Sequence, residues 1–390
     1  MMIQTVNKPA SALVNSIRTH RGFSLIELVI ALAIFATVIV GLYKVYDVQF
    51  SQQVKEYRVA ESSMELGIAK NLIERDLIMA GYGIMDDYGT TGFTARAASA
   101  AEGTGPGGSD KLTTQGTALG IGSRAAQEWA DVTATAPTLT FSSSTDAREN
   151  LISGDRIIIT NPSGTSGKTI LTQAGQWYFQ YNGQGNMPTV KSSPSTSFTS
   201  LQTGHVFYGL NTSSETDATF PYYTVLYSLG SITNNPSYCA PGTYSLLRAE
   251  SRTSNNPTGG DPVISCVLDF QVAFGLTDNI ASLDPSKALN YPINYWDNGG
   301  VNKAAAYTPK ELNQRLKQIR VYILVQEGNK DLTYNYVNPD PNAAAPDKIR
   351  VGELGLAGGA TGRDFQLSAA QRQYRWRVLT IVVTPRNIRG

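Results

Sequence analysis

The stretch RGFSLIELVIALAIFATVIVGLYK, residues 21–44, places one acid inside a long apolar run. From Phe23 to Tyr43 the only charged side chain is that of Glu27. A helix of this length rises about 30 Å, enough to cross the hydrocarbon core of a bilayer, so the stretch predicts one transmembrane helix. A carboxylate inside such a helix is costly and usually has a partner, which makes Glu27 a candidate functional residue.

The preceding residues, 1–22, carry Lys8, Arg18 and Arg21 and no acid. They contain no apolar run like that of an ordinary secretory signal, which predicts a short basic leader instead. Positive charge before a spanning helix favours a cytoplasmic N-terminus. We therefore expect residues 44–390 to lie outside the cytoplasm.

The helical pattern continues beyond the apolar run, because no proline occurs between Pro9 and Pro106. Apolar residues follow at helical spacing in two stripes on nearly opposite faces, which indicates a helix covered on two sides. The first stripe is Tyr46, Phe50, Val54, Tyr57, Met64, Ile68, Leu72 and Met79, and the second is Val59, Leu66 and Ile73. Gly81 supplies a stop, so one helix of about 85 Å is predicted over residues 24–80. A signal anchor followed by an unrelated helix is the alternative, but it leaves Glu27 unexplained.

The block RGFSLIELVIAL resembles the class III signal of type IV prepilins, in which a basic leader ends in glycine before phenylalanine and a glutamate. The resemblance implies that a membrane prepilin peptidase cuts between Gly22 and Phe23 and methylates the new amine of Phe23. It also implies that Glu27 pairs with the N-terminal ammonium of a neighbouring subunit. Such pairing makes physical sense because each charge alone is costly in an apolar medium. One departure is Gly41 in a region where many major pilins have a proline.

Three shorter stretches are similar to PilW-type minor pilins of the type IV pilus: residues 74–83, 153–160 and 374–387. This resemblance implies a non-enzymatic subunit that primes pilus assembly and lies near the pilus tip. The implied partners are other minor pilins, the major pilin, the prepilin peptidase, the assembly platform and inner-membrane lipid. A J-type pseudopilin of type II secretion is the close alternative. An enzyme or adhesin carried on a pilin stalk is a third hypothesis, for which the sequence offers no catalytic constellation.

The rest of the chain reads as a β-rich head, with short runs of period two between Gly, Ser, Pro and Asn clusters. Candidate strands are residues 155–160, 175–181, 222–229, 243–250, 266–276, 319–327 and 374–383. Both faces of the last run contain apolar residues, which favours a central strand. The predicted fold class is α+β: a long N-terminal helix packed on an antiparallel sheet, with an enlarged β-rich insertion between roughly residues 84 and 220.

The predicted divisions follow from these patterns. They are a leader (1–22), the transmembrane half of the long helix (23–43), its amphipathic half (44–83) and the extracytoplasmic head (84–390). Within the head, Thr308, Pro309 and Glu311 form a capping-box signature that predicts a short helix.

Cys239 and Cys266 are the two cysteines, and both lie in the expected extracytoplasmic part. Disulfides persist there, and closing this loop stabilises by roughly 3 to 4 kcal/mol on the chain-entropy model. We therefore predict a disulfide between them; two separate thiols are the alternative.

Other candidate chemistry has plainer interpretations. His205 lacks partners placed by spacing and His20 lies in the leader, so we expect a structural histidine and no catalytic triad. PSGTSGKT, residues 162–169, lacks the first glycine of a phosphate loop and reads as a hairpin turn. The acids at 86–87 and 340–347 lack calcium-loop spacing. We expect no cofactor or metal and, with a net charge of +1, no nucleic-acid partner.

Overall fold

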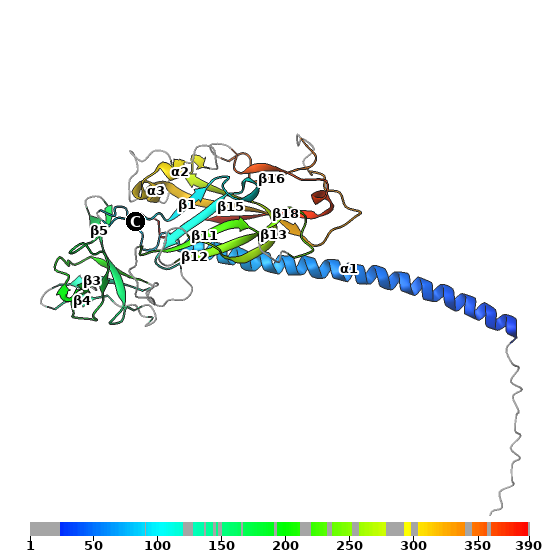
Figure 1. The fold of residues 1–390 in the computed structure, drawn as a ribbon, viewed down its shortest axis with the longest axis horizontal. Helices are drawn as coiled ribbons and strands as arrows, with labels where there is room; N and C mark the ends of the chain where they lie inside the picture. The colour runs from blue at the N-terminus through cyan, green and yellow to red at the C-terminus, as the bar shows by residue number, and fades with distance from the viewer. Residues whose placement is uncertain are drawn as a thin grey trace, which may run out of the picture. The chain divides into compact units, whose positions relative to one another are not determined.

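The N-terminal helix, α1, runs without a break from Leu25 to Met79 (Figure 1). It confirms the predicted helix to within one residue at each end. Gly81 ends it with a φ of +85°, a conformation that favours glycine, while its N–H donates to the carbonyl of Gln115 (2.8 Å). The Asn387 side chain donates to the Ile78 carbonyl (3.0 Å) and so caps the helix from the far end of the sequence.

The computed structural model describes most of the chain. The described residues are 24–89, 91–119, 128–135, 138–142, 146, 150–164, 167–190, 193–210, 220–231, 236–251, 257–277, 292–297, 303–339, 345–356 and 360–388. Two compact units divide the chain, residues 1–56 and 57–390, so α1 begins in the first unit and ends in the second.

The main sheet of the second unit has eight strands, and all its pairings are antiparallel. Along the sheet the order is β1 (Ala98–Ala101), β2 (Lys111–Gly116), β11 (Tyr223–Gly230), β12 (Tyr244–Ser251), β13 (Asp261–Leu276), β15 (Leu316–Glu327) and β18 (Arg375–Val383), with β14 (Tyr295–Asp297) paired to β13. The α+β fold class is confirmed.

The prediction that residues 374–383 form a central strand is wrong. Strand β18 ends the sheet order, and β15 is its one neighbour among the described strands. Its apolar residues on two faces have another cause, because both faces of the sheet are covered. Ile381 packs in the core on the α1 side, whereas Trp376 and Val378 pack against the core on the opposite side.

The two faces of the main sheet carry different cores. On one face Leu66, Ala69, Ile73 and Leu77 of α1 pack among side chains of β11, β13, β15 and β18. Full burial of each Leu or Ile contributes about 1.5 to 3 kcal/mol. The opposite face is covered in part by the hairpin of β16 (Lys348–Val351) and β17 (Arg363–Gln366). This double cover explains why the central strands read as nearly continuous apolar runs.

A second eight-stranded sheet lies between β2 and β11 in the sequence. Its strands are β3 (Trp129–Ala134), β4 (Thr140–Phe141), β5 (Arg156–Gly164), β6 (Gly167–Ile170), β7 (Phe179–Gln180), β8 (Thr189–Val190), β9 (Ser193–Ser197) and β10 (Val206–Gly209). It has its own core, with Ile157, Phe179 and Phe207 at zero exposure. The enlarged β-rich insertion is thus present, but β1 and β2, which fall inside the expected 84–220 range, belong to the main sheet.

An aromatic cluster joins the chain after α1 to the second sheet. Tyr88 and Phe93 contact Tyr222 edge-on, and Phe93 also meets Trp177 at 5.1 Å between ring centroids. Burial raises the pKa of Tyr88 and of Tyr222, so both phenols stay neutral. Trp177, Phe179 and Tyr181 therefore pack in the interior.

Short helices complete the described elements: η1 (Pro106–Gly108), α2 (Lys303–Ala306), α3 (Pro309–Arg315) and η5 (Gln371–Gln373). The predicted capping box is confirmed at α3. Thr308 Oγ1 accepts from the Glu311 N–H (3.2 Å), and Glu311 Oε2 accepts from the Thr308 N–H (2.8 Å).

Removing this cap is expected to cost about 1 kcal/mol of unfolding free energy in Thr308→Ala, because one N–H at the start of α3 loses its partner. Thermal unfolding of the full chain in detergent micelles measures the loss. Thr308→Ser keeps the hydroxyl and should stay close to the wild type; an equal loss in both variants would contradict the assignment.

Candidate functional site

Glu27 lies in the first turn of α1, and its side chain takes part in a cap. Its carboxylate accepts from the Ser24 N–H (3.0 Å), and Ser24 Oγ accepts from the Glu27 N–H (3.3 Å). This reciprocal pair is a capping box, and the sequence Ser-Leu-Ile-Glu carries its signature. Sequence reasoning missed it because the acid was considered only as a partner for another chain. The predicted cleavage residues Gly22 and Phe23 lie outside the described residues.

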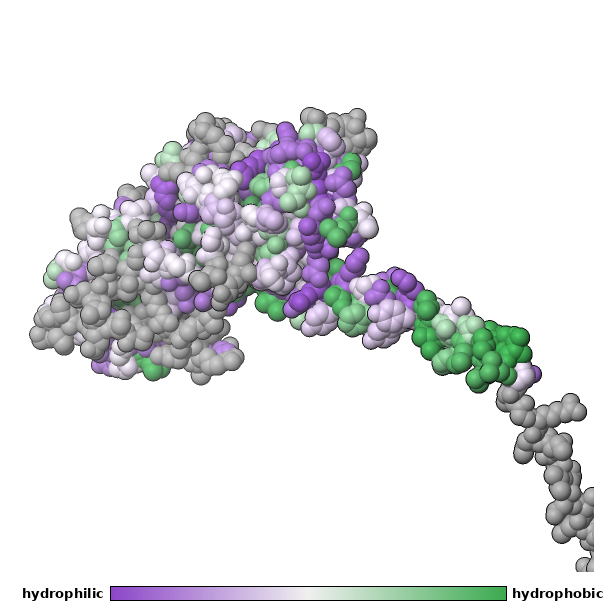
Figure 2. Space-filling model, turned by 45° about the vertical axis from the view of Figure 1, so that its right-hand side comes forward, coloured by the Kyte–Doolittle hydropathy of each residue, from purple (hydrophilic) through white to green (hydrophobic). Residues whose placement is uncertain are grey.

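The first half of α1 exposes its apolar side chains on all faces. None of the residues from Leu25 to Phe50 is buried, and Figure 2 shows this part of the helix as strongly hydrophobic. Within the described residues, α1 is the one helix long and apolar enough to span a membrane. A soluble helix would bury such a surface, so these side chains call for a lipid or protein environment.

An apolar stripe remains exposed further along the helix. In the second unit the sheet covers Leu66 and Ile73, whereas Tyr57, Met64 and Ile68 are exposed at 68%, 69% and 65%. We expected the amphipathic half of α1 to be covered on two sides. The chain itself covers one of them. The first apolar stripe, at Tyr57, Met64 and Ile68, has no cover within the described chain.

A buried polar cluster joins α1 to the sheet in the middle of this packing. Asp76, at zero exposure, accepts hydrogen bonds on Oδ2 from the Tyr227 hydroxyl and from Arg248 Nε, both at 2.7 Å. Arg248 Nη1 also donates to Glu250 Oε2 at 2.9 Å. Tyr227 lies on β11 and Arg248 on β12, so one carboxylate fixes the position of the helix along two neighbouring strands.

The ionisation states of this cluster follow from its surroundings. Burial, together with the negative charge of Asp76, raises the pKa of Tyr227 far above its usual value. Burial by itself would lower the pKa of Arg248, but the hydrogen bond and charge of Asp76 outweigh it and raise that pKa. The guanidinium therefore remains charged and the phenol remains neutral at any physiological pH.

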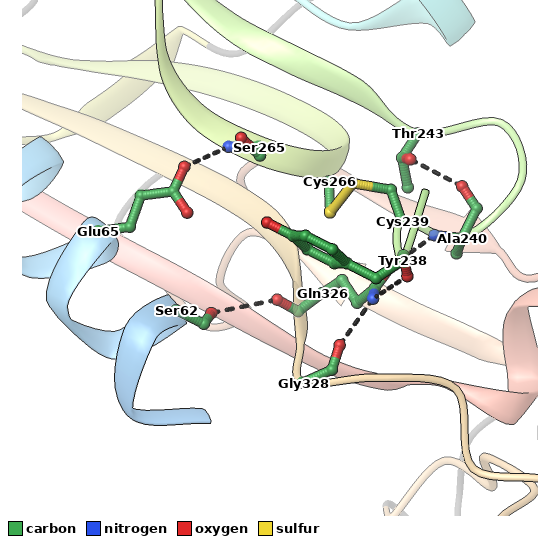
Figure 3. The surroundings of a disulfide bond; sticks show 10 residues. All are labelled: Ser62, Glu65, Tyr238, Cys239, Ala240, Thr243, Ser265, Cys266, Gln326 and Gly328. Atoms are coloured by element: carbon green, nitrogen blue, oxygen red, sulfur yellow. Dashed lines mark hydrogen bonds between the residues drawn. A yellow bond between two sulfur atoms is a disulfide. The ribbon is translucent and has the colours of Figure 1, made fainter. Parts of the chain in front are cut away.

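The disulfide predicted from the sequence lies beside the same helix. Cys239 and Cys266 are bonded, with 5.1 Å between their Cα atoms. Figure 3 shows Ser62 and Glu65 of α1 directed toward this region, where Glu65 Oε1 accepts from the Ser265 N–H (2.7 Å). The helix thus meets the sheet through apolar contacts, the Asp76 cluster and the surroundings of the disulfide.

The remaining candidates have structural surroundings. His205 is buried, its Nδ1 accepts from the Gln202 N–H (3.2 Å), and burial lowers its pKa. Strands β5 and β6 pair antiparallel on either side of residues 165–166, in agreement with the hairpin interpretation of PSGTSGKT. Asp86 accepts from the Lys168 N–H and from Asn313, each at 3.0 Å. Residues 340–344 and His20 lie outside the described part.

Among the described residues, no group of three or more His, Cys, Asp or Glu side chains is placed to hold a metal ion.

Comparison with known proteins gives one finding. Residues 17–43 match the family model described as the prokaryotic N-terminal methylation motif. No curated protein and no solved structure matches the chain. The match defines the class: the chain carries a type IV prepilin-like signal. This signal supports a type IV pilin-like or pseudopilin substrate, and the exposed apolar half of α1 fits a membrane anchor.

Proposed function

We propose that this chain is a minor pilin of a type IV pilus, of the PilW type, which primes pilus assembly and lies at or near the tip. The methylation motif supports a filament subunit. The large head supports a minor rather than a major component, because a second eight-stranded sheet with its own core is added to the main one. The subunit is structural and not an enzyme.

The processing and orientation follow from the same proposal. The prepilin peptidase cleaves between Gly22 and Phe23 and methylates the amine of Phe23, while α1 stays in the membrane. The basic residues of 1–22 hold the N-terminus in the cytoplasm, so residues 84–390 form a periplasmic head that later joins the pilus at the cell surface.

One observation carries the proposal. The helix that begins at the signal motif continues without a break into the sheet, and its exposed apolar surface extends past the membrane-spanning length to Ile68. A simple anchor needs exposed apolar side chains only within the bilayer. A helix that packs among the helices of other subunits needs them further along, which is what a filament core requires.

A J-type minor pseudopilin of a type II secretion system is the alternative, since it shares the signal, the long helix and a sizeable β-rich head. Its expected partners are secretion components rather than the major pilin.

Mass spectrometry of pili sheared from cells tests the proposal. The expected result is this chain in the pilus fraction, with N-methylated Phe23 as its first residue. Recovery of the processed chain with type II secretion partners, together with normal piliation after gene deletion, would assign it to the alternative. An unprocessed chain that begins at the leader would contradict both.

A further inference from the structure

The disulfide joins two segments that lie next to residues 58–65 of α1. These residues are the first turns of the helix within the second unit. Cys239 precedes β12, and Cys266 lies in β13 at 3% exposure. The strand pairing is irregular here, because Tyr244 pairs with Val267 whereas Leu246 pairs with Ile264. This β-bulge places Cys266 between two regular stretches of ladder.

Cys266 has a φ of +55°, in the left-handed region that residues with a side chain rarely adopt. Such a conformation persists where the surrounding structure enforces it. The disulfide to Cys239 is one constraint, and the ladder on either side of the bulge is the other. The peptide units around Cys266 are therefore held in one orientation, including the neighbouring Ser265.

Residues 58–65 of α1 contact the sheet through residues next to the disulfide. Glu65 accepts from the Ser265 N–H (2.7 Å), Ser62 Oγ lies 3.5 Å from the Gln326 carbonyl, and the Arg58 guanidinium lies 5.1 Å from the ring centroid of Tyr238. Ser265 and Tyr238 each directly precede a cysteine of the disulfide.

Gln326 of β15 connects these partners to one another (Figure 3). Its Nε2 donates to the carbonyls of Tyr238 (2.9 Å) and Gly328 (2.7 Å), and its Oε1 accepts from the Ala240 N–H (2.7 Å). The backbone on both sides of Cys239 is thus fixed to the strand that also receives Ser62.

Apolar packing in this part of the helix is limited to partly exposed contacts, such as that of Val59 with Gly328. The buried side chains of α1 begin at Leu66, and none of the residues 57–65 is buried. The polar contacts with the disulfide region therefore attach residues 58–65 to the sheet, whereas the apolar core and the Asp76 cluster hold residues 66–79.

We propose that the Cys239–Cys266 disulfide is a redox-sensitive clamp on α1. When oxidised, it holds residues 58–65 against the sheet; when reduced, it releases them, while residues 66–79 stay packed. A dithiol reductant supplies two electrons and two protons, so the S–S bond breaks into two thiols and the reductant becomes a disulfide. Cys266 can then leave its left-handed conformation, which turns the Ser265 N–H away from Glu65 and frees the Tyr238 segment from its tie to β13.

Limited trypsin digestion of the full chain in detergent micelles, before and after dithiothreitol, tests the clamp. Cleavage after Arg58 reports the released segment, and cleavage after Lys70 reports the packed segment of the same helix. Because cleavage tracks the population of the open state, reduction is expected to raise the rate at Arg58 about tenfold or more and to leave Lys70 unchanged. Equal acceleration at both sites would mean general loosening, and no change at Arg58 would mean no clamp; either result overturns the proposal.

Two sets of variants separate the disulfide from its neighbours. Without any reductant, the double variant Cys239→Ser/Cys266→Ser should be cleaved at Arg58 as fast as the reduced wild type. If that variant fails to fold, the comparison of oxidised and reduced wild type still tests the clamp. Gln326→Met keeps the disulfide but removes its ties to Tyr238, Gly328 and Ala240, so Arg58 should be sensitive even in the oxidised protein. Oxidised Gln326→Met that resists trypsin like the wild type would contradict the proposed route from disulfide to helix.

Discussion

Asp76→Ala is expected to lower the unfolding free energy of the head by about 3 to 5 kcal/mol, because it leaves the buried Arg248 guanidinium without its main counter-charge. A typical domain has only about 5 to 15 kcal/mol in total, so this variant should lose a large share of its stability. The loss falls at the contact that fixes α1 on β11 and β12. Urea titration of the full chain in micelles, followed by near-ultraviolet circular dichroism, measures it.

Glu74→Ala is the matched control on the same helix. Glu74 lies 3.6 Å from Lys70 near the surface, and such a pair contributes about 0.3 to 0.5 kcal/mol. Replacing the whole cluster, with Asp76→Leu, Tyr227→Phe and Arg248→Met, should recover most of the lost stability, because no charge is then left buried. Equal losses for Asp76→Ala and Glu74→Ala would contradict the role given to the buried cluster.

Glu27→Ala is expected to reduce incorporation into pili about 100-fold or more. If the carboxylate pairs with the ammonium of Phe23 on another subunit, its loss leaves that charge uncompensated in an apolar core, at about 3 kcal/mol or more. Quantitative immunoblotting of the pilus fraction against the membrane fraction gives the ratio. Asp47→Asn, an acid further along the same helix, is the control and should incorporate normally.

Glu27→Gln decides between the two roles that the structure and the sequence suggest. The amide oxygen can still accept from the Ser24 N–H, so the helix cap is kept while the charge is lost. An interchain ion pair requires Glu27→Gln to be as defective as Glu27→Ala. Normal incorporation of Glu27→Gln would show that the carboxylate serves as a helix cap alone.

Local patterns predicted much of this fold. The helix followed from its apolar stripes, an absence of proline and the glycine stop, and the cap of α3 followed from three residues close in sequence. These features depend on neighbours within a few positions. The place of β18 did not follow, because apolar residues on two faces show that a strand is covered above and below but say nothing of how many strands lie beside it.

The Asp76 cluster could not be predicted as a unit, since Tyr227 and Arg248 lie 151 and 172 positions away. One signal was present. Asp76 follows Ala69 by seven residues on the face that Leu66 and Ile73 bury, and an acid on a buried face needs a partner. The motif at residues 17–43 was fully readable because all of its parts are contiguous.

The cap that Asn387 places on α1 has a consequence for timing. Asn387 lies 309 positions after Ile78, whose carbonyl it caps. The next residue, Ile388, packs in the same core as Leu77. The helix is made first, yet its C-terminal end is completed only by a residue that follows it 309 positions later in the chain. We therefore expect the head to reach its final state only after Asn387 and Ile388 have been made, so that a chain terminated before them keeps an unfinished helix end and cannot pass as a mature subunit.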